Sequence, residues 1–162
     1  MSVTEITQQA NFPGQKNNSL SLEFEFVFVS PHEIGEYWKM IRPGLEEVSK
    51  HGGGAWMPED VYSAIKVGQS HLHIFYDDSS YEGFVVTTPM TDYSGVVLHV
   101  WGVFSEHQNQ RFHDCVNRQL DAWARNIQAK KITFSTTRKG WERVGKALGF
   151  YPTVQFYEKE VE

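Results

Sequence analysis

The chain has 162 residues, 40% of them hydrophobic, which fits one compact domain with a full core. A formal net charge of -5 and a pI near 5.8 lack the basic footprint of nucleic-acid binding, so we expect no nucleic-acid partner. A single cysteine, Cys115, excludes an internal disulfide framework, and the start MSVTEITQQ lacks the pattern of a signal peptide. Since no apolar run approaches the roughly 20 residues of a spanning helix, we expect a soluble, non-secreted protein with no membrane partner.

The first segment differs in composition from the rest. Residues 1–19 are polar, contain Pro13-Gly14 and show neither helical nor strand periodicity, which is typical of an arm or tail. We therefore expect an N-terminal arm at 1–19 and a single domain at 20–162. If the arm is ordered by contact with another chain, the arm is a binding segment for a protein partner.

The domain begins with alternating apolar residues over 20–29, which predict a half-buried strand. Ser30, Pro31 and Glu33 then offer an N-cap, a first-position proline and a capping-box carboxylate for a helix. The apolar face of this helix is interrupted at Pro43-Gly44 and ends before the glycines at 52–54. We interpret those glycines as a hinge, because they carry no nucleotide-loop residues. A second helix runs from Met57 to Gly68.

Three strands are expected at 71–76, 81–88 and 96–104, and their short links make them an antiparallel meander. The longest helix is predicted over 106–128, from apolar residues at spacings of three and four. A strand at 131–136, a short helix ending at Gly149-Phe150 and a last strand at 151–157 follow. The order β-α-α-β-β-β-α-β-α-β predicts an α/β (α+β) fold, with helices on both faces of a central mixed sheet.

This order, with the stretches RKGWERVGKALGF and VQFYEKEVE, resembles the GNAT (Gcn5-related N-acetyltransferase) superfamily, and within it a divergent group encoded by phages and prophages. The resemblance implies that acetyl-coenzyme A binds where the fourth and fifth strands separate. It also implies that the pyrophosphate lies on a Q/R-x-x-G-x-G/A loop at the start of the long helix, where N–H groups attract an anion.

The corresponding stretch of this chain departs from that pattern. With Gln110 at the first motif position, His113 and Cys115 stand where the glycines belong. Ser105 and Gln108 are expected to form a capping box that uses the helix N–H groups itself. Gln108, Gln110 and Arg111 remain the candidates for contacting acetyl-coenzyme A through their side chains.

The catalytic pattern N-x-x-A-x-x-x-Y-x-x-x-G-F, aligned on Gly149-Phe150, places Gly145 at the tyrosine that serves as general acid and Trp141 at the small residue beside the cofactor channel. Two candidates for a general base remain. His99 is either a base or a strand histidine hydrogen-bonded to a neighbour. Glu106 is either a base or a first-turn carboxylate of the helix.

Two further features carry structural interpretations. His71 and His73 point to the same face of a strand, but no third ligand follows from the spacing, so no metal site is predicted. Gly102 is expected to mark a bulge in the fourth strand.

The departures from the acetyltransferase pattern favour a non-catalytic protein-binding module, such as a virion or assembly component that contacts virion subunits through its arm. On this hypothesis no cofactor is expected, and the protein lies in the virion or the host cytoplasm. The alternative is an acetyl-coenzyme A-dependent N-acetyltransferase acting on an amine of a host or phage substrate, which predicts a cleft between the fourth and fifth strands. A third possibility is an acidic inhibitor of a host factor.

Overall fold

A computed structural model of the protein describes residues 24–161, and the predicted arm at 1–19 lies outside this range. The described elements follow one another in the order β1 (Glu25–Val29), α2 (Ile34–Ser49), α3 (Pro58–Lys66), β2 (His71–Asp77), β3 (Ser80–Asp92), β4 (Gly95–Ser105), α4 (Gln110–Asn126), β5 (Lys131–Phe134) and α5 (Trp141–Ala147). This is the predicted order up to its last strand.

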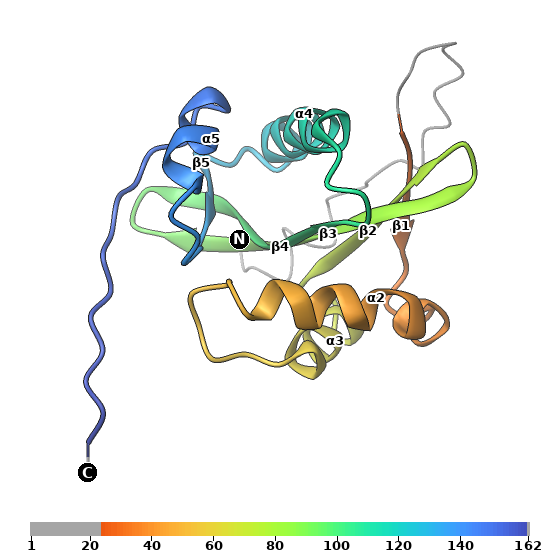
Figure 1. The fold of residues 1–162 in the computed structure, drawn as a ribbon, viewed down its shortest axis with the longest axis horizontal. Helices are drawn as coiled ribbons and strands as arrows, with labels where there is room; N and C mark the ends of the chain where they lie inside the picture. Colours follow the sequence, from red (N-terminus) through yellow and green to blue (C-terminus); the bar gives the residue numbers. More distant parts are fainter. Residues whose placement is uncertain (1–23, 162) are drawn as a thin grey trace.

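The five strands form one mixed sheet in the order β1-β2-β3-β4-β5. β1 to β4 are an antiparallel meander, as the short links predict, and β5 pairs in parallel with β4. Helix α4 covers one face of the sheet, while α2 and α3 cover the other (Figure 1). The mixed sheet between two helical layers confirms the predicted fold class.

Each face of the sheet has its own hydrophobic core. On the α4 side, Phe75, Leu98 and Phe112 are fully buried. On the other side, Ile41, Leu45 and Phe84 are fully buried between α2, α3 and the strands. Because side chains alternate along a strand, each central strand contributes to both cores.

Helix α2 differs from its prediction at both marked positions. It begins at Ile34 after a turn, its N-cap residue Glu33 makes no side-chain capping bond, and the helix continues through Pro43. The residue after that proline, Gly44, has to be small, because a Cβ at this position would lie 2.7 Å from the Phe84 ring. Tertiary packing of the helix on the sheet therefore outweighs the local breaking tendency of Pro43-Gly44.

The predicted last strand is wrong. Residues 151–161 are extended but belong to no strand, and all of them are exposed. They leave α5 and run away from the body of the protein (Figure 1). Alternating apolar residues specify a strand only where a neighbouring strand is available, and none of the described strands pairs with this segment. Among residues 24–161, no helix is both long and apolar enough to cross a membrane.

Candidate functional site

The sheet opens between β4 and β5. The two strands pair only from Val97 to Val100 and from Lys131 to Phe134, although β4 continues to Ser105. Past the end of β5 the chain turns toward the loop after α2, where the Thr137 N–H donates to the His51 carbonyl at 3.0 Å. This bond ties the segment after β5 to the α2 side of the sheet, where it no longer pairs with β4.

A cavity of about 150 Å³ lies in this gap. Its wall includes residues 100–103 of β4 and the end of β5, so it occupies the point where the strands separate. Both helical layers contribute to it, α2 through Val48 and α4 through Val116 and Leu120. The cleft predicted by the acetyltransferase alternative is therefore present.

The β4 wall of the cavity is shaped by a bulge. Val86 of β3 pairs with Gly102 and Thr87 pairs with Val100, so Trp101 has no partner in β3. A Cβ at Gly102 would lie 2.9 Å from a Val48 methyl group, and the glycine thus lets α2 approach the strand. The prediction that Gly102 marks a bulge is correct to within one residue. The extra residue increases the local twist that takes β4 away from β5.

Polar side chains reach the cavity from both layers. His113 and Asn117 come from α4, and His51 comes from the loop after α2. Burial lowers the pKa of His113, so its imidazole stays neutral near pH 7 and is able to accept a proton. Ser135 and Thr136 add hydroxyl groups from the loop after β5. Such a site combines proton acceptors and donors with an apolar wall.

Sequence reasoning missed most of these polar residues. The hinge interpretation covered the glycines at 52–54 and gave no role to His51, and His113 was placed only where a phosphate-loop glycine belongs. Asn117, Ser135 and Thr136 were not considered. They lie in separate elements with no shared spacing, so the fold alone brings them together. Nothing in the sequence indicated that they would share a cavity.

The start of α4 corrects the predicted capping box. The helix begins at Gln110, and its N-cap is Asn109, whose side chain accepts the Arg111 N–H at 3.0 Å. Ser105 accepts the N–H of Asn109, which lies before the helix, at 3.3 Å and donates to the buried Glu82 carboxylate at 3.2 Å. A buried carboxylate needs hydrogen bonds, and Glu82 takes them from the residues that would have begun the helix.

His107 is the second partner of that carboxylate, with 2.9 Å between its Nδ1 and Glu82 Oε2. Its hydrogen bond and charge interaction with Glu82 raise the pKa of His107. The stretch from 105 to 109 is therefore held as a loop that follows Glu82. Gln108 has a φ of 48°, which fits a loop and not the first turn of a helix.

The three predicted cofactor contacts lie outside the cavity lining. Gln108 is exposed, and Gln110 donates to Asp114 at 3.0 Å. Arg111 pairs with Asp77 at 2.6 Å, and its guanidinium lies 4.6 Å from the Phe24 ring centre. A cation–π contact and an ion pair thus direct Arg111 toward β1 and β2.

Neither predicted general base lines the cavity. His99 Nδ1 is hydrogen-bonded to Thr133 Oγ1 at 3.0 Å across the paired part of β4 and β5, and burial lowers its pKa. This is the strand-histidine interpretation weighed from the sequence. Glu106 is exposed in the loop before α4, so it is not a first-turn carboxylate.

Two aromatic residues close the α5 side of the cavity. Trp141 lines it, with its ring centre 4.8 Å from that of Phe134. Phe150 packs edge-on against Phe134 at 5.1 Å. Gly145, at the position aligned with the family tyrosine, brings no hydroxyl, and the hydroxyl groups that line the cavity are those of Ser135 and Thr136.

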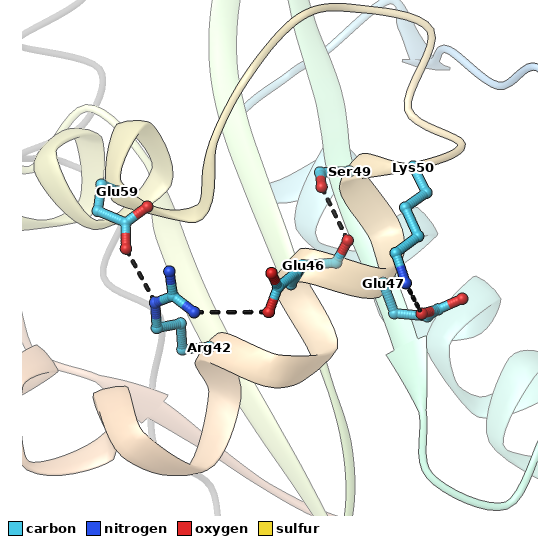
Figure 2. Close-up of polar contacts among 6 residues, drawn as sticks. All are labelled: Arg42, Glu46, Glu47, Ser49, Lys50 and Glu59. Atoms are coloured by element: carbon cyan, nitrogen blue, oxygen red, sulfur yellow. Dashed lines mark hydrogen bonds and ion pairs between the residues drawn. The ribbon is translucent and has the colours of Figure 1, made fainter.

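Charged residues of the second half of α2 pair with one another and with the start of α3. Arg42 bonds Glu59 at 2.9 Å and Glu46 at 3.5 Å, while Lys50 bonds Glu47 at 2.7 Å (Figure 2). Because each carboxylate already has a cationic partner, this face offers no concentrated negative field to a cationic substrate. Among residues 24–161, no group of three or more His, Cys, Asp or Glu side chains is placed to hold a metal ion.

No protein-family model matches the chain, and no curated protein matches it in sequence. Solved structures do match its fold. One is AAC(6')-Iy in complex with the bisubstrate analogue CoA-S-monomethyl-acetylneamine, at 18% identity and a TM-score of 0.59, over 86% of this chain and 99% of that one.

Two further matches are the ribosomal-protein-alanine N-acetyltransferase from Brucella melitensis biovar Abortus and a protein from Clostridium acetobutylicum named as a predicted acetyltransferase and solved with acetyl-CoA. The first has 10% identity and a TM-score of 0.59, over 86% of this chain and 98% of that one. The second has 12% identity and a TM-score of 0.61, over 85% and 96%.

These matches contradict the preferred hypothesis of a virion or structural protein, because all three are named as acetyltransferases or predicted acetyltransferases and none as a virion component. The expectation of no cofactor loses its basis as well, since two of the matching structures contain a coenzyme A compound. The phage-encoded group stays a prediction. The mixed sheet, its two helical layers and the opening between β4 and β5 together identify the fold of this chain as the GNAT acetyltransferase fold.

Proposed function

We propose that the protein is an acetyl-coenzyme A-dependent N-acetyltransferase acting on a primary amine. The observation that carries this proposal is the cavity at the separation of β4 and β5, in a fold whose matches include enzymes solved with acetyl-CoA and with a bisubstrate analogue. The departures from the family motifs concern the phosphate loop and the tyrosine. They leave this cavity intact.

The cavity fits the reactive end of the cofactor. Its volume of about 150 Å³ holds an acyl group and part of an extended arm, whereas a nucleotide has to lie outside it. Beyond Val100, the edge of β4 that faces β5 has no strand partner among residues 24–161. An amide-containing arm is able to pair with such an edge as an added strand. Acetyl-CoA, when bound, supplies an activated acetyl thioester.

The residues of the chain have three tasks in this reaction. The amine has to be neutral when it attacks, and the neutral imidazole of His113 is a suitable proton acceptor. His51, on the opposite wall, is the alternative acceptor for an amine that enters from the α2 side. Ser135 and Thr136 are the hydroxyl donors for the departing thiolate. The apolar wall of Val100, Val116 and Leu120 excludes water from the thioester.

A thermal melt with acetyl-CoA tests the first half of this proposal. At about 100 times the dissociation constant, a specific ligand adds roughly 2.7 kcal/mol to stability and raises Tm by several degrees. Asn117→Phe fills the cavity and should abolish the shift. Asn126→Phe makes the same change on the exposed end of α4 and should keep it. An unchanged Tm at millimolar acetyl-CoA contradicts the proposal.

Release of free thiol with a panel of amines tests the second half. We expect turnover with at least one amine, abolished by Asn117→Phe and retained by Asn126→Phe. His113→Gln and His51→Gln then distinguish the two proton acceptors. Only the substitution that removes the true base should lower kcat while leaving the acetyl-CoA melt shift unchanged. Binding without turnover on any amine argues against the transferase activity.

A further inference from the structure

The last described residues form an exposed apolar segment, which we call the C-terminal tail (residues 151–161). Tyr151, Val154, Phe156 and Tyr157 are 79%, 69%, 84% and 87% exposed. Val154 and Phe156 alternate as in a strand that has one buried face. Four large apolar side chains within seven residues are a costly surface for a protein to leave in water, and such patches mark binding surfaces.

The beginning of the tail is fixed beside the outer strand of the sheet. Helix α5 ends in a Schellman turn, in which the N–H of Phe150 donates to the Gly145 carbonyl at 2.8 Å and Gly149 adopts a φ of 87°. The Phe150 ring then packs on Phe134, the last residue of β5. The tail therefore starts at a defined place, at the end of β5.

The next residues direct the tail outward. Pro152 fixes its own φ and favours an extended conformation at Tyr151, so the chain leaves the Schellman turn straight. The tail runs away from α5 and from the sheet (Figure 1). To pair with β5 of its own chain, the tail would have to turn back at Tyr151-Pro152, where the backbone is extended instead.

The strand beside the start of the tail has a free edge. β5 is the last strand of the sheet, and it pairs only with β4 among the described residues. Ile132, Thr133 and Phe134 are half-buried, so the strand offers both backbone groups and apolar side chains along this edge. An unpaired edge strand is a template for another extended segment.

We propose that two copies of the chain exchange their C-terminal tails, each tail pairing with the outer edge of β5 in the other copy. A donor segment with strand alternation and an acceptor edge lie at the same end of the molecule, but the stiff exit at Tyr151-Pro152 separates them within one chain. Exchange of an identical element between two copies is an accessible route to a dimer when the hinge is held open. This inference is independent of the proposed enzymatic activity.

The mass in solution is the first test. Light scattering over a concentration series should give a dimer of about 37 kDa, twice the 18.7 kDa of one chain. A chain that ends at Phe150 should be a monomer. A full-length protein that is monomeric throughout, or a shortened chain that remains dimeric, overturns the proposal.

A pair of matched substitutions covers the case in which the shortened chain does not fold. Phe156→Asp should weaken the dimer at least tenfold, because it places a carboxylate on the alternating apolar face of the tail. Tyr93→Asp makes a similar change at a residue that is also fully exposed, at the tip of the β3–β4 hairpin, and should leave the dimer unchanged. Equal effects of the two substitutions contradict the assignment of the dimer to the tail.

Cross-linking decides between exchange and closure within one chain. A chain carrying Lys131→Cys is mixed with a longer, tagged chain carrying Val154→Cys and treated with a short bis-maleimide. The native Cys115 is 3% exposed and should not react. Exchange predicts a product of mixed size. The proposal is overturned if the mixture gives no product of mixed size. It is also overturned if a chain that carries both substitutions forms cross-links only within single chains.

Discussion

The two histidines of β2 make the stability of this protein depend on acid. His73 is fully buried, and its ring stacks on Trp123 with 4.0 Å between ring centres. Burial and the neighbouring His71 hold the pKa of His73 at about 3, while burial holds that of His71 at about 4, against an ordinary value of 6.5. The folded protein thus keeps these imidazoles neutral.

The sign of the pH effect follows from proton uptake. Below pH 6.5 the unfolded chain binds protons at these imidazoles and the folded chain does not, so acid favours unfolding. The contribution is complete above pH 6.5 and is lost as the pH falls toward the folded values. For His73 with a folded pKa of about 3, the free energy of unfolding should drop by about 2 kcal/mol between pH 7 and pH 5.

His73→Phe is the perturbation that isolates this term. It keeps an aromatic ring against Trp123 and removes the titrating group. Any change in stability at pH 7 does not matter, because the comparison uses only the difference between pH 7 and pH 5. His32→Phe, at an exposed position, is the matched control. Urea unfolding followed by tryptophan fluorescence at pH 7 and pH 5 gives the free energy for each protein.

Between pH 7 and pH 5, the free energy of unfolding of His73→Phe should fall by about 2 kcal/mol less than that of the unchanged protein. For His32→Phe it should fall by as much as for the unchanged protein. Taking the difference between proteins cancels the other groups that titrate in this range. If His73→Phe loses as much stability between pH 7 and pH 5 as the unchanged protein, the imidazole is not held neutral by burial, and the reasoning fails.

Three further outcomes are expected. Gly102→Val should clash with Val48 and narrow the cavity, lowering stability by about 1–3 kcal/mol and abolishing the acetyl-CoA melt shift; an unchanged shift would place the cofactor elsewhere. Asn109→Ala removes the N-cap of α4 and should cost roughly 1 kcal/mol in a urea melt, whereas an unchanged midpoint would show that the cap contributes nothing. If His113 is the base, its lowered pKa places the acid limb of the kcat/KM profile below pH 6.5, and a limb above that value would exclude it.

The sequence predicted the layers of the fold better than their ends. Alternation over the meander strands and the apolar stripe of α4 fixed which faces are buried, because burial repeats with the period of each element. The start of α4 was misplaced because Ser105 and His107 both bond Glu82, far away in the sequence, and hold residues 105–109 as a loop. The continuation of α2 through Pro43 likewise depends on its packing against the sheet.

The same contrast holds for the site. By itself the sequence determined a mixed α/β domain, and it showed that the family glycines and tyrosine are absent; an opening after the fourth strand was implied only by the family resemblance. Only the tertiary structure decided which side chains meet in the cavity, since His51, His113 and Ser135 come from elements far apart in the chain. It also decided that Arg111 faces Asp77 and that the tail pairs with no strand of its own chain within residues 24–161. Local patterns determine which face of an element is buried, but contacts between distant residues depend on how the elements pack against one another.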